Sequence, residues 1–413
     1  KCDRVLVVGS FLRKDHPLIA QRLRQSAKRG TKISVIHAAD DDLLIKLAAR
    51  AVVAPSQLPN VLAQVAKAAA ELKGMAVDAA VAAVTVSAEA KKMAESLLSG
   101  RNAAILLGNF AQQHPQAAAL QTLAQLIGQV TGAKIGFLGE AANSVGGYVA
   151  KALPSGAGRN AARMVTEPRR AYVLLNVEPE FDCADGRQAL AAMAKADTVV
   201  VLSAFKSAAA LEYADAILPV SPFTETSGSF VNTEGRVQSF NAVAKPLGDT
   251  RPAWKVLRVL GNLAKLDGFD YESSEDVRAE LVGGAEFVSS LDNNANVVAS
   301  LPVVNGTDGQ RASDLQRVAD VPIYFADPLV RRSPPLQKAA DAVAPAARMN
   351  AATLAKQGFS VGDKLRVRLG EGEALLIAHL DAGLADGCVR IAAAHQTTAD
   401  LGALFGQLTV ERA

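Results

Sequence analysis

The sequence predicts an α/β protein with two Rossmann-like parallel-sheet lobes, followed by a small C-terminal β-barrel-like domain. Three observations lead to this fold class. Short apolar segments alternate with helical patterns over roughly the first 270 residues. Several of these segments share one kind of opening into the next helix, and short alternating segments with glycine-rich turns follow near the C-terminus. Val, Ile and Leu runs between helices are typical of parallel sheets that are covered on both faces.

Residue types at its ends indicate the boundaries of the first expected strand–helix unit. A strand at 4–10 runs into Gly9, and a helix is expected over 16–29, with Pro17 in its first turn and Gly30 just after its end. Proline suits the first turn of a helix and glycine suits the residue that follows the last one. We expect further strands at 32–36, 103–108, 134–138, 171–177 and 197–203, and helices at 61–73 and 114–131.

The opening of this unit is repeated along the chain. VVGSFLRKDHP at 7–17 and LLGNFAQQHP at 106–115 share a strand, a glycine, a small polar residue, Phe and a His-Pro pair before a helix. A third strand ends in LLNVEPEF at 174–181, with Asn176 near the place of the small polar residue. The repetition favours two related lobes, although any parallel α/β protein repeats this pattern to some degree.

A change of pattern separates these lobes from the C-terminal part. KLRVRLG at 364–370 alternates apolar and basic residues, as expected of a half-buried strand beside a turn. We therefore assign 1–150 to the first lobe, 151–290 to the second, 291–344 to an extended linker and 345–413 to a small β domain.

Composition excludes several classes of protein. The 413 residues carry a net charge of +3, which gives no argument for binding nucleic acid or a membrane surface. Cys2, Cys183 and Cys388 are too few and too scattered to ligate an iron–sulfur cluster, and they favour a reducing compartment. No apolar run is long enough to span a bilayer. Because the chain opens at Lys1 without a methionine, we expect it to be a piece of a longer protein.

No catalytic constellation stands out. Neither GxGxxG nor GxxxxGK[ST] occurs, and the five histidines lack metal-binding spacing. His16 and His114 each precede a proline at an expected helix start, where capping and acid–base work are both open interpretations. A polar loop within 214–240 follows a strand end, where open α/β sheets bind ligands, but a structural network of turns is an equal alternative.

The order of these motifs resembles the molybdopterin oxidoreductase family. The resemblance covers most of 1–270, and its most specific part is ADAILP…NTEGRVQ at 214–238. LAKQGFSVGDKLRVRLGEGEA at 354–374 is similar to the C-terminal barrel that covers the guanine-nucleotide cofactor in this family. The resemblance implies that certain loops surround a pterin cofactor in molybdenum relatives, and the matching residues here are Gly9, Ser10, Asn176, Glu178, Thr224, Glu225, Asn232, Glu234 and Arg236.

Within the family, two details look more like the large iron–sulfur subunit of bacterial NADH–quinone oxidoreductase (respiratory complex I). FLRKDHP at 11–17 replaces the family's Asn-Pro, with Leu12 where Asn or Pro is expected, and the segment 324–342 is similar to that subunit's linker. The resemblance then implies an empty relic of the pterin site, no cofactor, metal or catalytic residue in this segment, and 4Fe-4S and 2Fe-2S clusters in a missing N-terminal part.

This interpretation also implies a function for the segment. It would be a structural and interaction part of an enzyme that passes electrons from NADH to quinone, inactive on its own. Its partners would be the NADH-binding and quinone-side subunits of the peripheral arm, on the cytoplasmic side of the inner membrane. The alternative is part of a molybdopterin-guanine-dinucleotide enzyme such as a formate dehydrogenase or a nitrate reductase.

Overall fold

The computed structural model describes residues 2–282, 287, 291 and 315–413. These residues form two compact units. The first comprises the described residues up to Leu138 together with 315–325 and 335–413, and the second comprises those from Gly139 to 291 together with 326–334.

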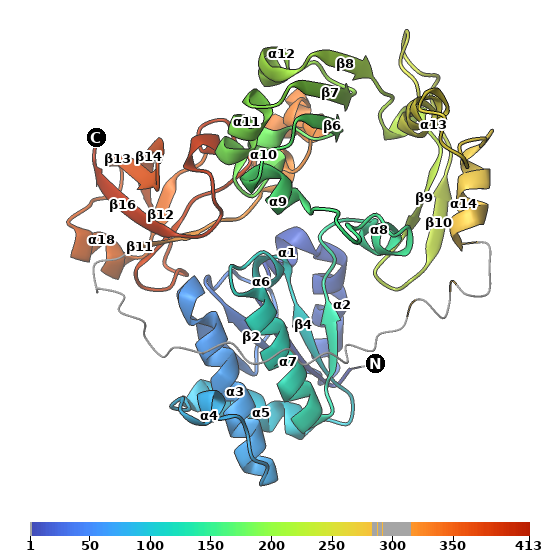
Figure 1. The fold of residues 1–413 in the computed structure, drawn as a ribbon. Coiled ribbons are helices and arrows are strands. Elements are labelled where there is room, and N and C mark those ends of the chain that lie inside the picture. Colours follow the sequence, from blue (N-terminus) through green and yellow to red (C-terminus); the bar gives the residue numbers. More distant parts are fainter. Residues whose placement is uncertain (1, 283–286, 288–290, 292–314) are drawn as a thin grey trace. The chain divides into compact units, whose positions relative to one another are not determined.

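A five-stranded parallel sheet is the centre of the first unit (Figure 1). Its order is β3-β2-β1-β4-β5, so the direction in which strands are added reverses between β1 and β4. Such a reversal is the topological switch point at which open α/β sheets bind ligands. The strands are β1 (Arg4–Val8), β2 (Lys32–His37), β3 (Ala49–Val52), β4 (Ala103–Leu107) and β5 (Lys134–Phe137).

Helices cover both faces of this sheet, as the apolar strands predict. Leu6 and Val8 belong to one hydrophobic core with α3, α5 and α7, whereas Val5 and Val7 face the side covered by α2. The fold class predicted for this part of the chain is therefore confirmed. The helices are α1 (Leu12–Asp15), α2 (Pro17–Ala27), α3 (Leu58–Lys73), α4 (Ala79–Ala82), α5 (Ala88–Leu98), α6 (Asn109–Gln112) and α7 (Ala117–Thr131), with a 3-10 turn η1 (Pro55–Gln57).

A closed six-stranded barrel completes the first unit. Its order is β11-β15-β12-β14-β13-β16. Leu365 and Val367 point into the barrel core, while Arg366 and Arg368 lie outside and pair with Glu373, as the alternation predicts. The elements are β11 (Leu315–Val318), η3 (Ile323–Phe325), α17 (Pro334–Gln337), β12 (Ala347–Met349), α18 (Ala351–Gln357), β13 (Lys364–Leu369), β14 (Gly372–Leu380), β15 (Cys388–Arg390), η4 (Ala399–Leu401) and β16 (Gln407–Arg412).

The barrel corrects the range that we assigned to a linker. β11 lies within 291–344, yet it pairs with β15 and β16 and is buried along its length. Two of its side chains are polar, which hides the strand from a hydrophobic pattern. Arg317 is 1% exposed and donates hydrogen bonds to the carbonyls of Gly402 and Ala403 at 3.2 and 2.7 Å. Residues 292–314 of the expected linker lie outside the described residues.

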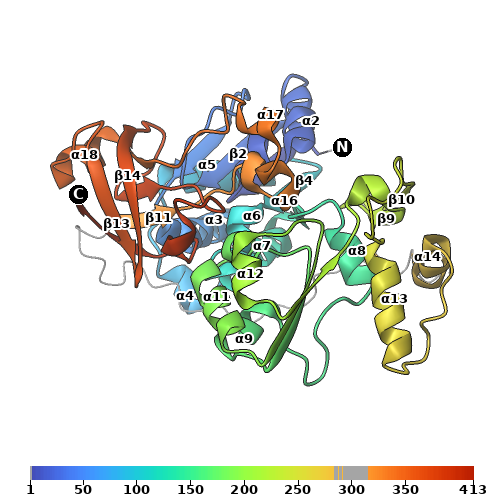
Figure 2. The ribbon, with the colours of Figure 1, turned by 90° about the horizontal axis from the view of Figure 1, so that it is seen from above.

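The second unit contains a three-stranded parallel sheet of order β6-β7-β8 and a separate hairpin of β9 and β10. Figure 2 shows α9, α11 and α12 gathered on one side of the sheet. The strands are β6 (Ala171–Leu175), β7 (Thr198–Ser203), β8 (Ala216–Pro219), β9 (Gly228–Val231) and β10 (Val237–Phe240). The helices are α8 (Ser144–Val149), α9 (Ala161–Thr166), α10 (Pro179–Asp182), α11 (Gly186–Ala194), α12 (Ala208–Tyr213), α13 (Ala253–Leu263), α14 (Ser274–Val282) and α16 (Pro328–Arg331), with a 3-10 turn η2 (Phe223–Glu225).

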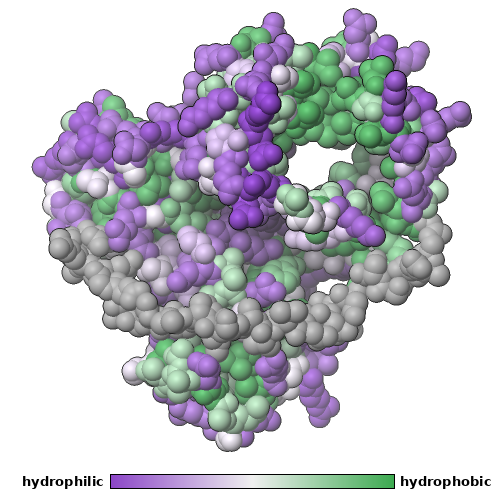
Figure 3. Space-filling view, viewed as in Figure 1, coloured by the Kyte–Doolittle hydropathy of each residue, from purple (hydrophilic) through white to green (hydrophobic). Residues whose placement is uncertain are grey.

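The other face of this sheet carries exposed apolar side chains. Val173 is 61% and Leu175 is 38% exposed, although both lie on a strand of a parallel sheet. Hydrophobic residues also gather over β7, β8 and α13 (Figure 3). The core of this unit therefore lies on the helix side, around Tyr172, Met193 and Val201.

Arg390 of the barrel joins the barrel to the loops that follow β1 and β2. Its guanidinium contacts Asp41 at 2.8 Å and Asp320 at 2.9 Å, and its Cζ lies 4.7 Å from the ring centroid of Phe11. Burial alone would lower the pKa of Arg390, but the charges of Asp320 and Asp41 outweigh it and raise the pKa. Arg390 is therefore a permanent buried cation that three elements share.

Removing this cation tests how much the joint stabilises the unit. Arg390→Met should lower the free energy of unfolding by about 3–5 kcal/mol, because it leaves the buried Asp320 without its counter-ion. The matched control is Arg366→Met, which removes an exposed cation beside Glu373 and should cost less than about 1 kcal/mol. Urea unfolding of both variants provides the comparison, and equal losses would contradict the assignment.

Gly9 is the second residue on which this unit depends. Its φ is +59°, and a Cβ built there would lie 2.7 Å from both the Cβ and the backbone nitrogen of Ala111. Gly132 is also left-handed, with φ of +76°, but a Cβ there would meet nothing within 4 Å. The two glycines therefore separate steric clash from backbone strain.

Gly9→Ala should consequently destabilise the chain more than Gly132→Ala. The control should lose about 1–2 kcal/mol through left-handed strain alone. Gly9→Ala should lose that amount and a further cost from overpacking, typically about 1–3 kcal/mol. Thermal melts of the two variants measure the difference, and indistinguishable melts would show that α6 moves away without cost.

Candidate functional site

The switch point of the first sheet brings the two matching sequence openings side by side. β1 and β4 are paired in register, and each runs directly into its glycine. The Gly9 N–H donates to the carbonyl of Ile36 at 2.9 Å, and the Gly108 N–H donates to the carbonyl of Val8 at 2.9 Å. In both openings the chain leaves a strand and the glycine N–H bonds to a neighbouring strand, but the backbone differs, because Gly9 has a φ of +59° and Gly108 a φ of −86°.

Aromatic side chains fill the space above this switch point. The rings of Phe11 and Phe110 are 5.8 Å apart, and His37 lies between them at 4.5 and 5.1 Å. Phe405, from the segment before β16, packs on Phe110 at 4.8 Å. Leu12 is fully buried, in a core cluster with Leu138. Side chains of this chain therefore fill much of the space at the switch point.

Three buried polar side chains remain around this point. Ser10 Oγ, Asn109 Oδ1 and both ring nitrogens of His37 have no hydrogen-bond partner among the described residues. Ser10 and His37 line a cavity of about 20 Å³. A volume of this size holds about one water molecule, so a bound water would satisfy these groups. Burial lowers the pKa of His37 to about 4, which keeps its ring neutral at pH 7.

His114, the second histidine before a proline, has a structural place. Its Nδ1 accepts a hydrogen bond from the Gln116 N–H at 2.9 Å, and its Nε2 lies 3.0 Å from the carbonyl oxygen of Pro55. Both ring nitrogens therefore lie against the backbone just before α7, whose N-cap is Gln116 and carries no side-chain cap hydrogen bond.

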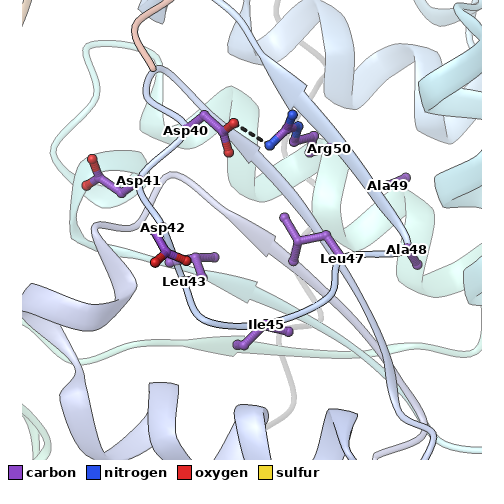
Figure 4. Close-up of a pocket in the computed structure, with 9 residues that line it drawn as sticks. All are labelled: Asp40, Asp41, Asp42, Leu43, Ile45, Leu47, Ala48, Ala49 and Arg50. Atoms are coloured by element: carbon purple, nitrogen blue, oxygen red, sulfur yellow. Dashed lines mark hydrogen bonds and ion pairs between the residues drawn. The ribbon is translucent and has the colours of Figure 1, made fainter. Parts of the chain in front are cut away.

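A larger pocket, of about 500 Å³, opens where β2 ends (Figure 4). Its lining combines carboxylates, one cation and apolar side chains: Asp40, Asp41, Asp42, Leu43, Ile45, Leu47, Ala48, Ala49 and Arg50. The volume is in the range of small-molecule sites. The position, after the second strand of a Rossmann-like unit, is where an acidic residue binds the ribose hydroxyls of a nucleotide in dinucleotide-binding folds.

The acidic residues of this pocket differ in what they already bind. Asp40 pairs with Arg50 across the pocket, and Asp41 pairs with Arg390. Asp42 accepts only a loop hydrogen bond, from the Leu44 N–H at 2.8 Å, among the described contacts. Arg13 of α1 donates a hydrogen bond to the Asp42 carbonyl at 2.6 Å, so a cation also reaches this edge. The pocket can thus offer Asp42 to hydroxyl or amino groups.

Sequence reasoning did not single out these pocket residues. The run DDD at 40–42 follows the apolar segment at 32–36. An acidic residue after the second strand is a signal of nucleotide binding, but Asp40 stands 31 residues after Gly9, farther than the roughly 20 residues of the usual fingerprint, and no GxGxxG motif accompanies it.

In the second unit, Asn176 and Glu178 follow β6. Asn176 has a φ of +51° and donates its N–H to the carbonyl of Leu202 at 2.8 Å, which reproduces the turn of Gly9. Asparagine tolerates this left-handed conformation better than most residues. Glu178 is buried, and its carboxylate is paired with Arg331 and Arg332 of the same unit.

The remaining predicted residues serve loop structure in the same unit. The Thr224 carbonyl accepts from the N–H groups of Val243 and Ala244, and Glu225 accepts from the Leu247 N–H at 3.0 Å. Asn232 closes the β9–β10 hairpin, since its Oδ1 accepts from the N–H groups of Glu234 and Arg236 at 3.0 and 2.9 Å.

The nine predicted cofactor residues thus fall into separate groups. Gly9 and Ser10 belong to the first unit and the other seven to the second. The described contacts of Thr224 and Glu225 run to the segment after β10, those of Asn232 stay within its hairpin, and those of Glu178 run to arginines. That these residues surround a cofactor stays a prediction.

Metal binding and membrane crossing are two further functions that the described residues bear on. No group of three His, Cys, Asp or Glu side chains among them is arranged to hold a metal ion. None of the described helices combines the length and the apolar composition that crossing a bilayer requires.

Comparison with known protein families shows which family this chain belongs to. The family model described as molybdopterin oxidoreductase matches residues 1–263. The chain belongs to the molybdopterin oxidoreductase family. The family resemblance predicted from the sequence motifs is therefore confirmed at this level.

Individual relatives match shorter stretches. A protein of Staphylococcus aureus (strain MRSA252) named as a candidate formate dehydrogenase is 38% identical over 91 residues, which are 22% of this chain and 9% of that protein. A protein of the same description from Staphylococcus haemolyticus (strain JCSC1435) is 36% identical over 92 residues, again 22% and 9% of the two chains. The match thus spans about a tenth of the length of these relatives.

A solved structure shares the fold over the whole chain. Acetylene hydratase from Pelobacter acetylenicus superposes with a TM-score of 0.72 at 13% identity, covering 100% of this chain and 78% of that one. At this identity the likeness shows the fold alone. The relatives support the molybdenum-enzyme alternative better than the complex I interpretation.

The residues present fit a family cofactor in one place and not in another. The pocket after β2 has the volume and the carboxylates that suit the nucleoside end of a dinucleotide. At the switch point the described aromatic rings pack beside a cavity of about 20 Å³, and the carboxylate of Glu178 is paired with arginines. The described residues therefore fit the nucleoside end of such a cofactor and not its pterin end.

Asp15, the last residue of α1, is a partly buried carboxylate whose ionisation can be tested. Burial, and then the nearby charge of Asp320, raises the pKa of Asp15 from an ordinary 3.8 to about 6. A folded-state pKa above the unfolded one means that ionised Asp15 costs stability above pH 6, and that this cost is absent below about pH 4.

Asp15→Asn should therefore raise the free energy of unfolding by about 2–3 kcal/mol at pH 7.5, at 1.36 kcal/mol for each pKa unit. The gain should disappear as the pH falls from 6 to 4. Asp341→Asn, which changes an exposed carboxylate, is the control and should show no such profile. Urea unfolding across this pH range measures both variants, and a gain independent of pH would contradict the assignment.

Proposed function

We propose that this chain is part of a molybdopterin-dependent oxidoreductase of the formate dehydrogenase type. Membership of the family and the two staphylococcal relatives support this proposal. The structural observation that carries it is the pocket of about 500 Å³ after β2, which presents carboxylates at the nucleoside position of a Rossmann-like unit.

The residues of this chain would act by binding and orienting. Asp42 would accept hydrogen bonds from ribose hydroxyls or from guanine N–H groups, and Arg13 would bring positive charge to the same edge. Gly9 allows the strand–helix turn beside them to stay tight. The bound group would supply a molybdenum centre that takes up electrons from the substrate.

A second candidate rests on a different observation. Leu12, where the family has Asn or Pro, is a fully buried core residue, and Glu178 is neutralised within its own unit. Both features favour a scaffold that keeps the fold without the cofactor, as in the iron–sulfur subunit of NADH–quinone oxidoreductase. In that case the segment would hold neighbouring subunits of the peripheral arm at the cytoplasmic side of the membrane.

Analysis of the intact parent protein separates the two candidates. The first candidate expects stoichiometric molybdenum and guanine nucleotide released by acid hydrolysis. The second expects neither, together with several iron–sulfur clusters and electron transfer from NADH to quinone in the assembled complex. Molybdenum without NADH oxidation would overturn the second candidate, and the reverse result would overturn the first.

The pocket itself predicts a result with this chain alone. Under the first candidate, GMP should raise the melting temperature saturably, since a ligand at a hundredfold excess over its Kd adds about 2.7 kcal/mol to the free energy of unfolding. Asp42→Ala should abolish the shift, whereas Asp249→Ala, an exposed carboxylate of the second unit, should leave it unchanged. A shift that survives Asp42→Ala would place nucleotide binding elsewhere.

A further inference from the structure

The carboxyl edge of the second sheet is closed by a short segment of the same chain. Residues 326–334 belong to the second unit, whereas the residues on either side of them belong to the first. The segment places Arg331 and Arg332 against the residues that follow β6 and β7. This edge is the position at which open parallel sheets bind their ligands.

The two arginines share one carboxylate between them. Arg331 Nη1 contacts Glu178 Oε2 at 2.8 Å, and its Nη2 pairs with Asp182. Arg332 Nη2 pairs with the other oxygen of Glu178. One guanidinium thus bridges two carboxylates, which requires a planar fork of donors and cannot be reproduced by the point charge of a lysine.

Aromatic rings complete the contact. The Cζ of Arg331 lies 4.9 Å from the ring centroid of Phe181, and the Cζ of Arg332 lies 4.9 Å from that of Phe205. The side chains of Arg331 and Glu178 are 9% and 6% exposed, so the pair is largely removed from water. Pairs in such surroundings are weakly screened by salt.

Hydrogen bonds within the segment hold its backbone in one conformation. Asp327 accepts hydrogen bonds from the N–H groups of Leu329 and Val330 at 2.8 and 3.0 Å, which caps the single turn of α16. The Arg332 Nη1 also donates to the carbonyl of Pro328 at 3.2 Å. Both arginines therefore lie at the end of one capped turn.

Without the segment, this edge would be strongly acidic. Glu178 and Asp182 would lose their counter-ions, and Glu180 lies beside them with a buried carboxylate oxygen that has no partner among the described residues. Burial, and then the charges of Glu178 and Asp182, raise the pKa of Glu180. Such an edge would repel phosphates and attract guanidinium groups.

We propose that Glu178, Asp182, Phe181 and Phe205 form an arginine-binding socket, and that the chain's own segment 326–334 docks in it as a plug that can release. Glu178 is accordingly a residue that holds the plug and not a cofactor ligand. The docked plug closes the carboxyl edge of this sheet, and its release exposes a site for a guanidinium-bearing ligand. This inference is independent of which proposed function is correct.

Hydrogen exchange of the full chain tests the socket. In Arg331→Lys, the amides of 326–334 should exchange at least tenfold faster, because the ammonium group cannot bridge Glu178 and Asp182. Amides of β6 and β7 should keep their protection, since the plug opens locally. Arg366→Lys makes the same change at an exposed ion pair of the barrel and should alter neither region.

A second variant removes the opposite partner. Glu178→Gln should speed exchange of the same segment to a similar extent, and if this variant fails to fold, Arg331→Lys alone decides. Unchanged exchange of the segment in Arg331→Lys would overturn the proposal. Equal acceleration of β6, β7 and the segment would also overturn it, because the segment would then be an inseparable part of the core.

Discussion

The first unit depends on one buried guanidinium. Arg390 ends β15, and its contacts with Asp41, Asp320 and the ring of Phe11 tie the barrel to two loops of the parallel sheet. A buried ion pair adds little net stability, but removing one partner leaves an uncompensated charge. The main effect of Arg390 is therefore to specify which surface of the barrel contacts the loops after β1 and β2. Its net contribution to the free energy of unfolding is small. The packing of Phe405 over the switch point and the shape of the pocket after β2 both depend on how the barrel contacts these loops.

The sequence predicted those parts of the fold that depend on local chemistry. Apolar strands, proline at helix starts and glycine after helix ends act over a few residues, and the helices at 17–27, 58–73 and 117–131 follow from them. The turn after a parallel strand is equally local. Gly9 and Asn176 both adopt left-handed conformations and bond to a neighbouring strand. The sequence match placed Asn176 at the position of the small polar residue Ser10, whereas its backbone corresponds to that of Gly9.

The parts that the sequence did not predict depend on partners far apart in the chain. β11 is a strand because Gln316 and Arg317 find polar partners near Ser56 and Gly402, which no local pattern encodes. The family resemblance implied that Glu178 belongs to a loop around the pterin cofactor, a prediction that stays untested. Glu178 is paired with arginines more than 150 residues later, and only the fold reveals that the charge is already neutralised. The acidic pocket after β2 was within reach of sequence reasoning and was overlooked because no glycine motif accompanied it.

The two units close their carboxyl edges by the same physical means. In each, acidic side chains that follow parallel strands are neutralised by arginines from the C-terminal part of the chain: Arg390 in the first unit, Arg331 and Arg332 in the second. A doubly wound sheet leaves such edges open by its geometry, so something must satisfy the charges gathered there. Internal arginines do this without a ligand and preserve the fold. Arg390 leaves part of the first unit's edge open, because Asp42, beside the paired Asp41, is not paired with a cation among the described residues and the pocket there is large enough for a nucleoside. We therefore expect ligand binding in this chain to depend on which carboxylates lack a counter-ion, and not on the strand–turn–helix units that both edges share.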